Sequence, residues 1–370
     1  MADWGVGVLG GGGDAGEGHI RGYQATGRAE VVALWDVGEA KGRKRCEDAG
    51  VPVFCRELDE LLAREDVQVV SVCTPDHLHA DHAEAALRAG KHVLCEKPMC
   101  TTREDAARLV RAVRETGKVM LVGHNYHFRP DYMAMAEACR AGEIGRVWLA
   151  EGDYISNLHY LYGPQGRTPW RSDAAAPQDI LLGGGCHPLG LMRWAMGSEV
   201  VEVHAYSNHL SEPLLPIDDA YVMTMRWDNG AVGKLIAASG CRAYVPLGGH
   251  LVLWGTEGTL WGSRLYRHDE ATHRTELVRD YGELCRQHPP RVTGTAQVHY
   301  WAEQCDHMLD CVEGKAAPQA TVVDGARVMA ALVAAVESAR TGQLVTVDND
   351  FGWDGRYRSA IGHAGRVHRV

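Results

Sequence analysis

The sequence predicts an α/β domain built on a doubly wound parallel sheet, followed by an α+β domain with a large, mostly antiparallel open sheet. Three observations support this. Strand-like and helix-like segments alternate through about residue 124, a glycine-rich turn joins the first of each, and longer strands separated by turn signals follow. A chain of 370 residues also suits two domains, since a domain typically has about 100–200 residues.

In the first region the apolar runs are short and are bounded by turn residues. The run 67–73 is mostly apolar, as expected of a strand buried on both faces. Gly90 marks the end of one helix, and Thr102 begins another in a capping pattern. We expect strands at 5–9, 29–35, 67–73, 92–95 and 119–123, and helices at 16–25, 40–49, 77–89 and 102–115.

The second region has a different pattern of apolar runs and turn residues. Asn229 and Gly230 separate two apolar runs, which is a strong hairpin signal. The stretch 160–185 is rich in Gly, Pro and Ala, and we expect it to be a long functional loop. We expect strands from residue 147 onward, among them 200–206, 220–227, 231–238 and 250–254, and late helices at 297–312 and 324–339.

Composition narrows the possible partners. The net charge is −10, from 38 basic and 48 acidic residues, which disfavours nucleic acid as a partner. The sequence has no run of about 18 apolar residues, so we expect no membrane span. Residues 1–4 do not resemble a signal peptide. The 11 cysteines contain no Cys-x-x-Cys pair, so we expect reduced, mostly buried thiols in a cytoplasmic protein.

The turn after the first strand fits G-x-G-x-x-G, a pattern that predicts a dinucleotide site when it links a strand to a helix. In this motif the first glycine allows a tight turn, the second lets the backbone meet a pyrophosphate, and the third lets helix and strand pack closely. The run of glycines leaves the register open by one residue, so Gly10 and Gly12 are alternatives, and a plain flexible turn is the competing interpretation. The motif residues are Gly11, Gly12, Gly13, Asp14, Ala15 and Gly16.

Asp36 strengthens the dinucleotide interpretation. It ends the second expected strand, 20 residues after Gly16, where a carboxylate accepts hydrogen bonds from the ribose hydroxyls and repels a 2′-phosphate. We therefore predict a Rossmann domain that prefers NAD. Lys41 and Arg43 lie nearby and keep NADP possible.

Further motifs resemble one family. The chain reads Thr74-Pro75-Asp76-His77-Leu78-His79, then Ala89-Gly90-Lys91-His92-Val93 and Glu96-Lys97-Pro98. With His19 three residues after Gly16, this pattern resembles the glucose–fructose oxidoreductase/inositol dehydrogenase (Gfo/Idh/MocA) family. Later segments agree, and the resemblance covers nearly the whole chain: they are 142–145, 185–188, 255–260 and 334–340.

The resemblance implies an NAD(P)-dependent oxidoreductase that transfers a hydride to or from a hydroxyl or keto carbon of a sugar, cyclitol or glycoside. It implies a dinucleotide-binding domain over 1–124, and a substrate-binding and oligomerisation domain over 125–370 that forms a homodimer or homotetramer. Lys97 would contact nicotinamide and substrate and stabilise the reacting oxygen. Together with Lys97, the positions that would contact the coenzyme are Thr74, Pro75, His77, His79, Glu96 and Asn125.

His187 matches the family's second catalytic group, a histidine that would act as general base. The family pattern has an aspartate four residues earlier, and this chain has Gly183 there. Position 190, often aspartate in relatives, is also glycine. His187 would act alone or with a group from the preceding loop, for which His159, Asp173 and Asp179 are candidates. A packed core histidine is the competing interpretation.

Aromatic and basic side chains near the same loop are candidates for binding a sugar ring. Trp170 and Arg171 offer an aromatic face and a guanidinium, although a hydrophobic anchor is the simpler alternative. Tyr126 follows the strand expected at 119–123 and would contact substrate, as would Asp179 and His187, while Arg129 would brace that junction.

Two other functions stay open. One is a glycoside-cleaving or epimerising enzyme that retains NAD and restores it within each cycle. The other is a non-catalytic dinucleotide sensor, which intact Glu96-Lys97-Pro98 and His187 disfavour. We expect no metal at His77, His79 and His82, because 77 and 79 do not share a helix face. We expect Cys186 to be a small thiol in a tight turn rather than a nucleophile.

Overall fold

The computed structural model describes residues 3–243, 251–292 and 299–353. The chain forms two compact units. The first contains the chain up to Arg129 together with Pro289–Ala326, and the second contains Pro130–His288 and Arg327–Asp350. No helix in the described part of the chain combines the length and the apolar character needed to cross a membrane.

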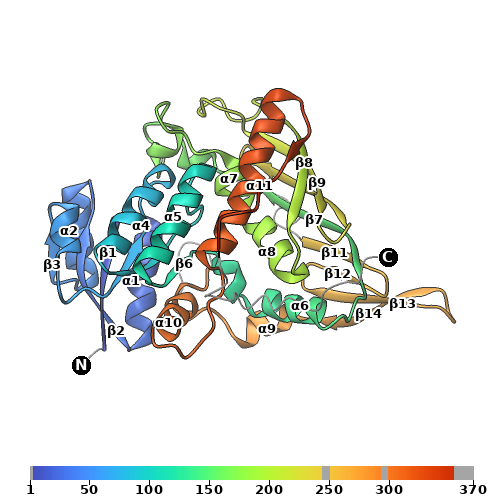
Figure 1. Ribbon diagram of the computed structural model, residues 1–370, viewed down its shortest axis with the longest axis horizontal. Helices are drawn as coiled ribbons and strands as arrows, with labels where there is room; N and C mark the ends of the chain where they lie inside the picture. The colour runs from blue at the N-terminus through green and yellow to red at the C-terminus, as the bar shows by residue number, and fades with distance from the viewer. Residues whose placement is uncertain (1–2, 244–250, 293–298, 354–370) are drawn as a thin grey trace. The chain divides into compact units, whose positions relative to one another are not determined.

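The first unit is built on a six-stranded sheet with the order β3-β2-β1-β4-β5-β6. Every pairing in it is parallel, and this order is that of a dinucleotide-binding doubly wound sheet. Its strands, in blue and cyan in Figure 1, are β1 Trp4–Leu9, β2 Ala29–Trp35, β3 Val53–Cys55, β4 Val69–Val72, β5 His92–Cys95 and β6 Met120–Val122. The α/β prediction for this region is confirmed.

Helices follow the strands of this sheet. Thr102 accepts a hydrogen bond from the Asp105 N–H at 3.1 Å, and Gly117 (φ 66°) ends the same helix. The expected cap is therefore present. The helices are α1 Asp14–Thr26, α2 Glu39–Ala49, α3 Leu58–Leu62, α4 His79–Arg88, α5 Arg103–Thr116 and α10 Trp301–Val312, with the 3₁₀ turns η1 Asp76–Leu78 and η2 Asn125–Phe128.

The late helix α10 belongs to this first unit because it packs on α1. Its Met308 and Leu309 join Ile20 and Tyr23 of α1 in one buried cluster. Trp301 lies against Gly18, where a Cβ atom would come within 2.4 Å of the indole. A glycine at this position therefore allows the close approach of the two helices.

The second unit is built on a nine-stranded sheet with the order β14-β13-β12-β11-β7-β10-β9-β8-β15. Neighbouring strands are antiparallel except for β10 and β7. The expected mostly antiparallel sheet is confirmed. The strands are β7 Val147–Ile155, β8 Val200–Asn208, β9 Ala220–Trp227, β10 Val232–Ala238, β11 Leu251–Gly255, β12 Thr259–Trp261, β13 Arg264–Asp269, β14 Arg274–Asp280 and β15 Val345–Thr346.

Asn229 and Gly230 form the expected hairpin between β9 and β10, with Gly230 at φ 87°. Helix α8 packs on β7 and β11, and α7 on β9 and β10. The helices and 3₁₀ turns of this unit are α6 Pro130–Arg140, η3 His159–Leu161, η4 Pro169–Ser172, α7 Ile180–Gly183, α8 Cys186–Met196, α9 Gly282–Gln287 and most of α11 Val322–Thr341.

Several expectations need correction. The stretch 160–185 is not one long loop, because it contains η4 and α7 and leads directly into α8. Helix 77–89 starts as the 3₁₀ turn η1, since the Thr74-Pro75 bend precedes it. The expected strand 250–254 is seen from residue 251, and the expected helix 297–312 from 301. Residues 250, 297–298 and 354–370 lie outside the described residues.

Candidate coenzyme and substrate sites

The glycine-rich turn lies between β1 and α1 and leaves little room for side chains. Gly10 has φ +77°, the left-handed conformation that favours glycine. A Cβ atom at Gly11 would lie 2.3 Å from Leu34, and one at Gly16 would lie 2.6 Å from the Gly10 carbonyl. At Gly13 the nearest described atom would be 3.6 Å away. The backbone is therefore approachable at Gly13 and tightly packed elsewhere.

Gly13 is the N-cap of α1, and among the described residues no side chain caps this helix start. Asp14 and Ala15 are the first residues of the helix. The N–H groups of a first turn lack partners within the helix and carry the positive end of its dipole. A helix start exposed in this way suits a pyrophosphate.

Asp36 follows β2 and faces the glycine turn. Its Oδ2 atom accepts the Gly12 N–H at 2.8 Å, and its Oδ1 atom accepts the Gly38 N–H at 2.8 Å. Each carboxylate oxygen has further acceptor capacity for a ribose hydroxyl. The Lys41 stem lies over Gly12, with Cγ 3.1 Å from where a Cβ atom would stand. These residues fit a dinucleotide with a free 2′-hydroxyl.

His79 connects the bend after β4 to the segment after β5. Its Nε2 atom lies 2.7 Å from the Thr74 carbonyl oxygen, and its Nδ1 atom lies 2.7 Å from the Pro98 carbonyl oxygen. Both partners of this buried histidine are carbonyl oxygens, which only accept hydrogen bonds. Pro75 precedes η1, and His77 in η1 is exposed. The structure thus brings Thr74, Pro75 and His79 together at the ends of β4 and β5.

Glu96 is a buried carboxylate immediately after β5, next to Lys97. Its Oε1 atom lies 3.0 Å from His19 Nε2, and its Oε2 atom accepts the Lys97 N–H at 3.2 Å. His19 Nδ1 lies 2.9 Å from Ser71 Oγ. Burial alone would raise the pKa of Glu96, but the hydrogen bond and charge of His19, with the charges of Lys97 and His299, lower that pKa to about 2. Glu96 is therefore a stable anion beside Lys97.

Lys97 is half-buried at the C-terminal end of β5. Ligands of doubly wound sheets bind at this edge. Gly123, after β6, allows the close packing, since a Cβ atom there would come within 2.9 Å of Glu96 Cα. Lys97 thus follows the end of β5, which is held by close packing against Gly123.

His299 is a residue of this site that the sequence analysis missed. Asn125 Nδ2 lies 2.5 Å from His299 Nδ1, and the imidazole stacks on Trp301 with ring centroids 4.5 Å apart. Burial and the charge of Lys97 lower the pKa of His299 to about 4, against the opposing effect of Glu96. The signal in the sequence was weak, because 174 residues separate this histidine from Asn125.

Tyr126 lies in η2, directly after Asn125. The Arg129 guanidinium lies 5.8 Å from the centre of its ring. Tyr126 and Arg129 are both half-buried. Arg129 therefore lies beside the aromatic ring of Tyr126 at the end of η2.

In the second unit, Arg171 braces the loop before α7. Its Nε donates to Thr168 Oγ1 at 2.9 Å, its guanidinium lies 4.6 Å from the Trp170 ring centre, and its Nη1 donates to Gln178 Oε1. Trp170 is half-buried. The structure brings Trp170 and Arg171 together and adds Gln178, which the sequence analysis did not consider.

Asp179 is the N-cap of α7. Its Oδ1 atom accepts the Leu181 and Leu182 N–H groups at 2.7 and 3.3 Å, and its Oδ2 atom accepts the Tyr221 hydroxyl at 2.8 Å. Burial raises the pKa of Asp179, while these hydrogen bonds oppose the increase. The carboxylate therefore has a structural role in starting α7.

The other two loop candidates also have local partners. His159 Nδ1 lies 2.9 Å from Glu212 Oε2. Asp173 is exposed and accepts the Ala175 N–H at 2.9 Å. The described contacts of these residues fix the loop, and none of them involves His187.

His187 is buried in the first turn of α8, and its ring stacks on Tyr154 with centroids 5.9 Å apart. The Tyr154 ring occupies the space beside Gly184, where a Cβ atom would lie 2.4 Å from it. A Cβ atom at Gly183 would lie 2.8 Å from Gln178 Nε2. The position where the family resemblance leads one to expect aspartate is thus closed by Gln178.

The cysteines and one cluster of possible metal ligands are further groups with potential chemistry. All 11 cysteines are free thiols and most are buried, including Cys186, whose Sγ lies 3.6 Å from the Gly183 carbonyl oxygen. Among the described residues, His268, Glu270 and His273 offer ligand atoms within 4.8 Å of one another, and all three are exposed.

The fold and the glycine turn define a dinucleotide-binding protein, and comparison with known proteins identifies it as an oxidoreductase. Residues 4–124 match the family model described as "Oxidoreductase family, NAD-binding Rossmann fold". Residues 132–261 match the "GFO/IDH/MocA C-terminal domain". The chain belongs to the Gfo/Idh/MocA family of oxidoreductases. The predicted family, the NAD-binding domain and the oxidoreductase class are confirmed.

Individual relatives span most of the chain. The 1,5-anhydro-D-fructose reductase of Ensifer adhaerens is 28% identical over 330 residues, covering 89% of this chain and 94% of that enzyme. The dTDP-3,4-didehydro-2,6-dideoxy-alpha-D-glucose 3-reductase of Streptomyces violaceoruber is 30% identical over 301 residues, covering 74% and 85%. A levoglucosan dehydrogenase, solved in complex with NADH and levoglucosan, shares the fold with a TM-score of 0.79 at 24% identity, covering 93% and 99%.

Proposed function

We propose that this NAD(P)-dependent oxidoreductase transfers a hydride to or from a secondary alcohol carbon of a polyhydroxylated ring, namely a sugar, cyclitol or glycoside. The observation that carries the proposal is the placement of Lys97 at the sheet edge, next to the buried Glu96 anion. Relatives named for anhydrofructose, inositol and levoglucosan support this class of substrate.

Lys97 is assigned to the reacting oxygen. An ammonium group can donate a hydrogen bond to that oxygen and stabilise the negative charge that develops as the hydride leaves carbon. The neighbouring Glu96 carboxylate favours the charged form of this lysine. Lys97 therefore acts as an electrostatic catalyst, and NAD, when bound, supplies the hydride acceptor.

His187 is assigned as the general base. An imidazole titrates near neutral pH and can take the hydroxyl proton during oxidation and return it during reduction. Tyr154 fixes the plane of its ring. The neighbouring amide of Gln178 lies against Gly183 in place of a carboxylate, so this histidine works without an acidic residue at position 183.

The coenzyme is assigned to residues 1–124, and substrate binding and oligomerisation to residues 125–370. NAD is favoured because Asp36 carries its charge at the glycine turn. The backbone of Gly11–Gly16 would hold the pyrophosphate. The remaining coenzyme contacts are assigned to Thr74, Pro75, His77, His79, Glu96, Lys97 and Asn125, and substrate contacts to Lys97, Tyr126, Trp170, Arg171, Asp179 and His187.

A coenzyme and substrate panel tests the proposal. The purified protein is mixed with NAD, and separately with NADP, against sugars, cyclitols and glycosides, while reduced-nicotinamide absorbance and products are followed together. We expect reduced coenzyme to accumulate with one ring class. Lys97→Ala should retain NAD binding but lose most turnover, and unchanged turnover would remove Lys97 from the mechanism.

A retained-coenzyme cycle is the alternative favoured by the missing carboxylate at Gly183. In that cycle a ring carbon is oxidised, the adjacent C–H bond becomes acidic, and elimination or epimerisation follows before the carbon is reduced again. Converted substrate without accumulated reduced coenzyme would support this cycle over the simple dehydrogenase.

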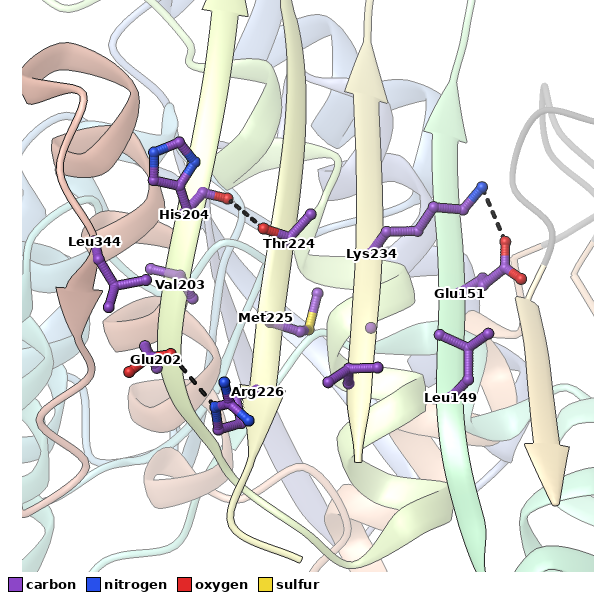
Figure 2. Close-up of a pocket in the computed structure, with 12 residues that line it drawn as sticks. Leu149, Glu151, Glu202, Val203, His204, Thr224, Met225, Arg226, Lys234 and Leu344 are labelled. Atoms are coloured by element: carbon purple, nitrogen blue, oxygen red, sulfur yellow. Dashed lines mark hydrogen bonds and ion pairs between the residues drawn. The ribbon is translucent and has the colours of Figure 1, made fainter. Parts of the chain in front are cut away.

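A homodimer or homotetramer is proposed to form through the nine-stranded sheet. Val222 and Val232 are about half exposed on one face of it. The same face carries a groove of about 460 Å³, where Lys234 pairs with Glu151 at 2.9 Å and the other lining side chains are those shown in Figure 2. Apolar patches with internally paired charges suit a second copy of the chain. Light scattering of wild type and Val222→Asp tests this, since a monomeric wild type contradicts it.

A cytoplasmic location is proposed as well. The free, mostly buried thiols suit a reducing compartment. Cell fractionation with antibody detection would test this, and recovery from an oxidising compartment would contradict it.

A further inference from the structure

Three consecutive glycines precede α8, and neighbouring atoms occupy the space beside each of them. Gln178 lies against Gly183 and Tyr154 against Gly184, at distances that a Cβ atom would not tolerate, while at Gly185 a Cβ atom would lie 2.5 Å from the Leu181 carbonyl oxygen. The small residues therefore make room for specific neighbours. Gln178 is the polar one with a flexible side chain, and it is 6% exposed.

The orientation of the Gln178 carboxamide is fixed by chemistry. Arg171 donates to its Oε1 atom, and a guanidinium has no acceptor, so the carbonyl oxygen must face Arg171. The amide nitrogen then faces Gly183, as the 2.8 Å approach of Nε2 to the Cβ position indicates. Arg171 is itself fixed by Thr168 and Trp170. The amide N–H groups therefore have a defined direction.

This direction places the amide at position 183, four residues before the proposed base. Gly183 ends α7, Gly184 and Gly185 follow it, and His187 lies in the first turn of α8. Gln178 Nε2 lies 2.8 Å from where a Cβ atom at Gly183 would stand. The amide thus takes the space of the side chain that the family pattern has four residues before the histidine.

We propose that Gln178 is a specificity-determining residue whose amide N–H, oriented by Arg171 and seated on Gly183, donates to a neutral oxygen of the substrate near the carbon served by His187. The amide nitrogen carries two hydrogens, so it can serve the protein and a substrate at once. A neutral donor selects an uncharged acceptor, such as a ring hydroxyl or ring oxygen. This inference rests on the proposed function and extends it to the substrate.

The seating of Gln178 is tested by a double-mutant cycle in unfolding. Gly183→Ala in the wild-type background should lower the Tm by about 3 °C or more, because the new Cβ meets Gln178. In the Gln178→Ala background the same change should leave the Tm unchanged or raise it, as alanine favours helices. Equal shifts in both backgrounds would overturn the proposal, whether or not a substrate is known.

The recognition step is tested with Gln178→Glu, which keeps a partner for Arg171 and replaces the N–H donor by an acceptor. With a substrate found in the panel, we expect KM to rise about tenfold, with NAD affinity unchanged. Gln287→Ala, an exposed residue of α9, is the matched control and should behave as wild type.

Deoxy or fluoro analogues then locate the bonded oxygen. One analogue should lose about tenfold in kcat/KM with wild type and little with Gln178→Glu. If wild type turns over ring substrates and no analogue distinguishes the two proteins, Gln178 does not recognise the substrate. If wild type turns over no ring substrate, the proposed function fails and the recognition role fails with it, while the unfolding cycle reports separately on the seating of Gln178.

Discussion

Replacing Glu96 by Gln removes a buried charge while keeping the size of the side chain and an oxygen that can accept the Lys97 N–H. The pKa of Glu96 falls from its usual 4.5 to about 2, through His19 first and the charges of Lys97 and His299. A difference of this size corresponds to about 3 kcal/mol of folding free energy. We therefore expect Glu96→Gln to lower the free energy of unfolding at pH 7 by up to about 3 kcal/mol.

The pH dependence gives the sign of this effect. A carboxyl whose pKa is lower in the folded state stabilises the protein above its unfolded pKa, and this stabilisation is lost as the pH falls from about 4.5 towards 2. The difference between wild type and Glu96→Gln should therefore be constant above about pH 5 and shrink below it.

Urea unfolding followed by circular dichroism between pH 7 and pH 3 measures this difference, and other carboxyl groups cancel because both proteins contain them. Glu104→Gln, an exposed change in the first turn of α5, is the control. A difference that is below about 0.5 kcal/mol at pH 7, or that does not change with pH, would refute the assignment of Glu96 as a buried, stabilised anion.

Three further changes test other parts of the structure. Asp36→Ser should narrow the preference for NAD over NADP by about tenfold or more, because it removes the charge that disfavours a 2′-phosphate; an unmoved ratio of kcat/KM values would contradict this. Gly16→Ala should cost about 1–3 kcal/mol in urea unfolding and weaken NAD binding in titration calorimetry, because its Cβ would meet the Gly10 carbonyl at 2.6 Å. Tyr221→Phe should cost about 1–2 kcal/mol by removing the 2.8 Å hydrogen bond to Asp179, and an unchanged Tm would argue against that bond.

The parallel sheet was predictable because its signals are local. The run 67–73 is mostly apolar, which fits a strand covered on both faces, and the structure has β4 at its centre. Strands 29–35, 92–95 and 220–227 coincide with β2, β5 and β9 residue for residue. The Asn229-Gly230 turn was equally clear, since its side chains and backbone favour a hairpin without help from distant residues.

Contacts between distant segments were not predictable. Helix α10 packs on α1, and the signal for this contact in the sequence is Gly18, which leaves space for Trp301. His299 reaches Asn125 across 174 residues. No local pattern encodes such a pairing, because it depends on the completed sheet.

The Gly183–Gly185 run was noticed in the sequence only as a departure from the family. The structure explains these glycines, because the side chains of Gln178 and Tyr154 occupy the space beside Gly183 and Gly184. A run of small residues before a functional histidine signals that other side chains pack there, and it does not reveal which ones. Asp179, which is proposed as a substrate contact, also has hydrogen bonds that start α7, and the sequence alone did not indicate them.

The most direct test of the account is the fate of hydrogen at the reacting carbon. A ring substrate from the panel, deuterated at its secondary alcohol carbons, is incubated with the protein and NAD, and the reduced coenzyme is examined by mass spectrometry. Direct hydride transfer predicts a coenzyme that is heavier by one deuterium, formed at a rate that Lys97→Ala greatly reduces. Product and unlabelled reduced coenzyme together would contradict hydride transfer from the ring carbon.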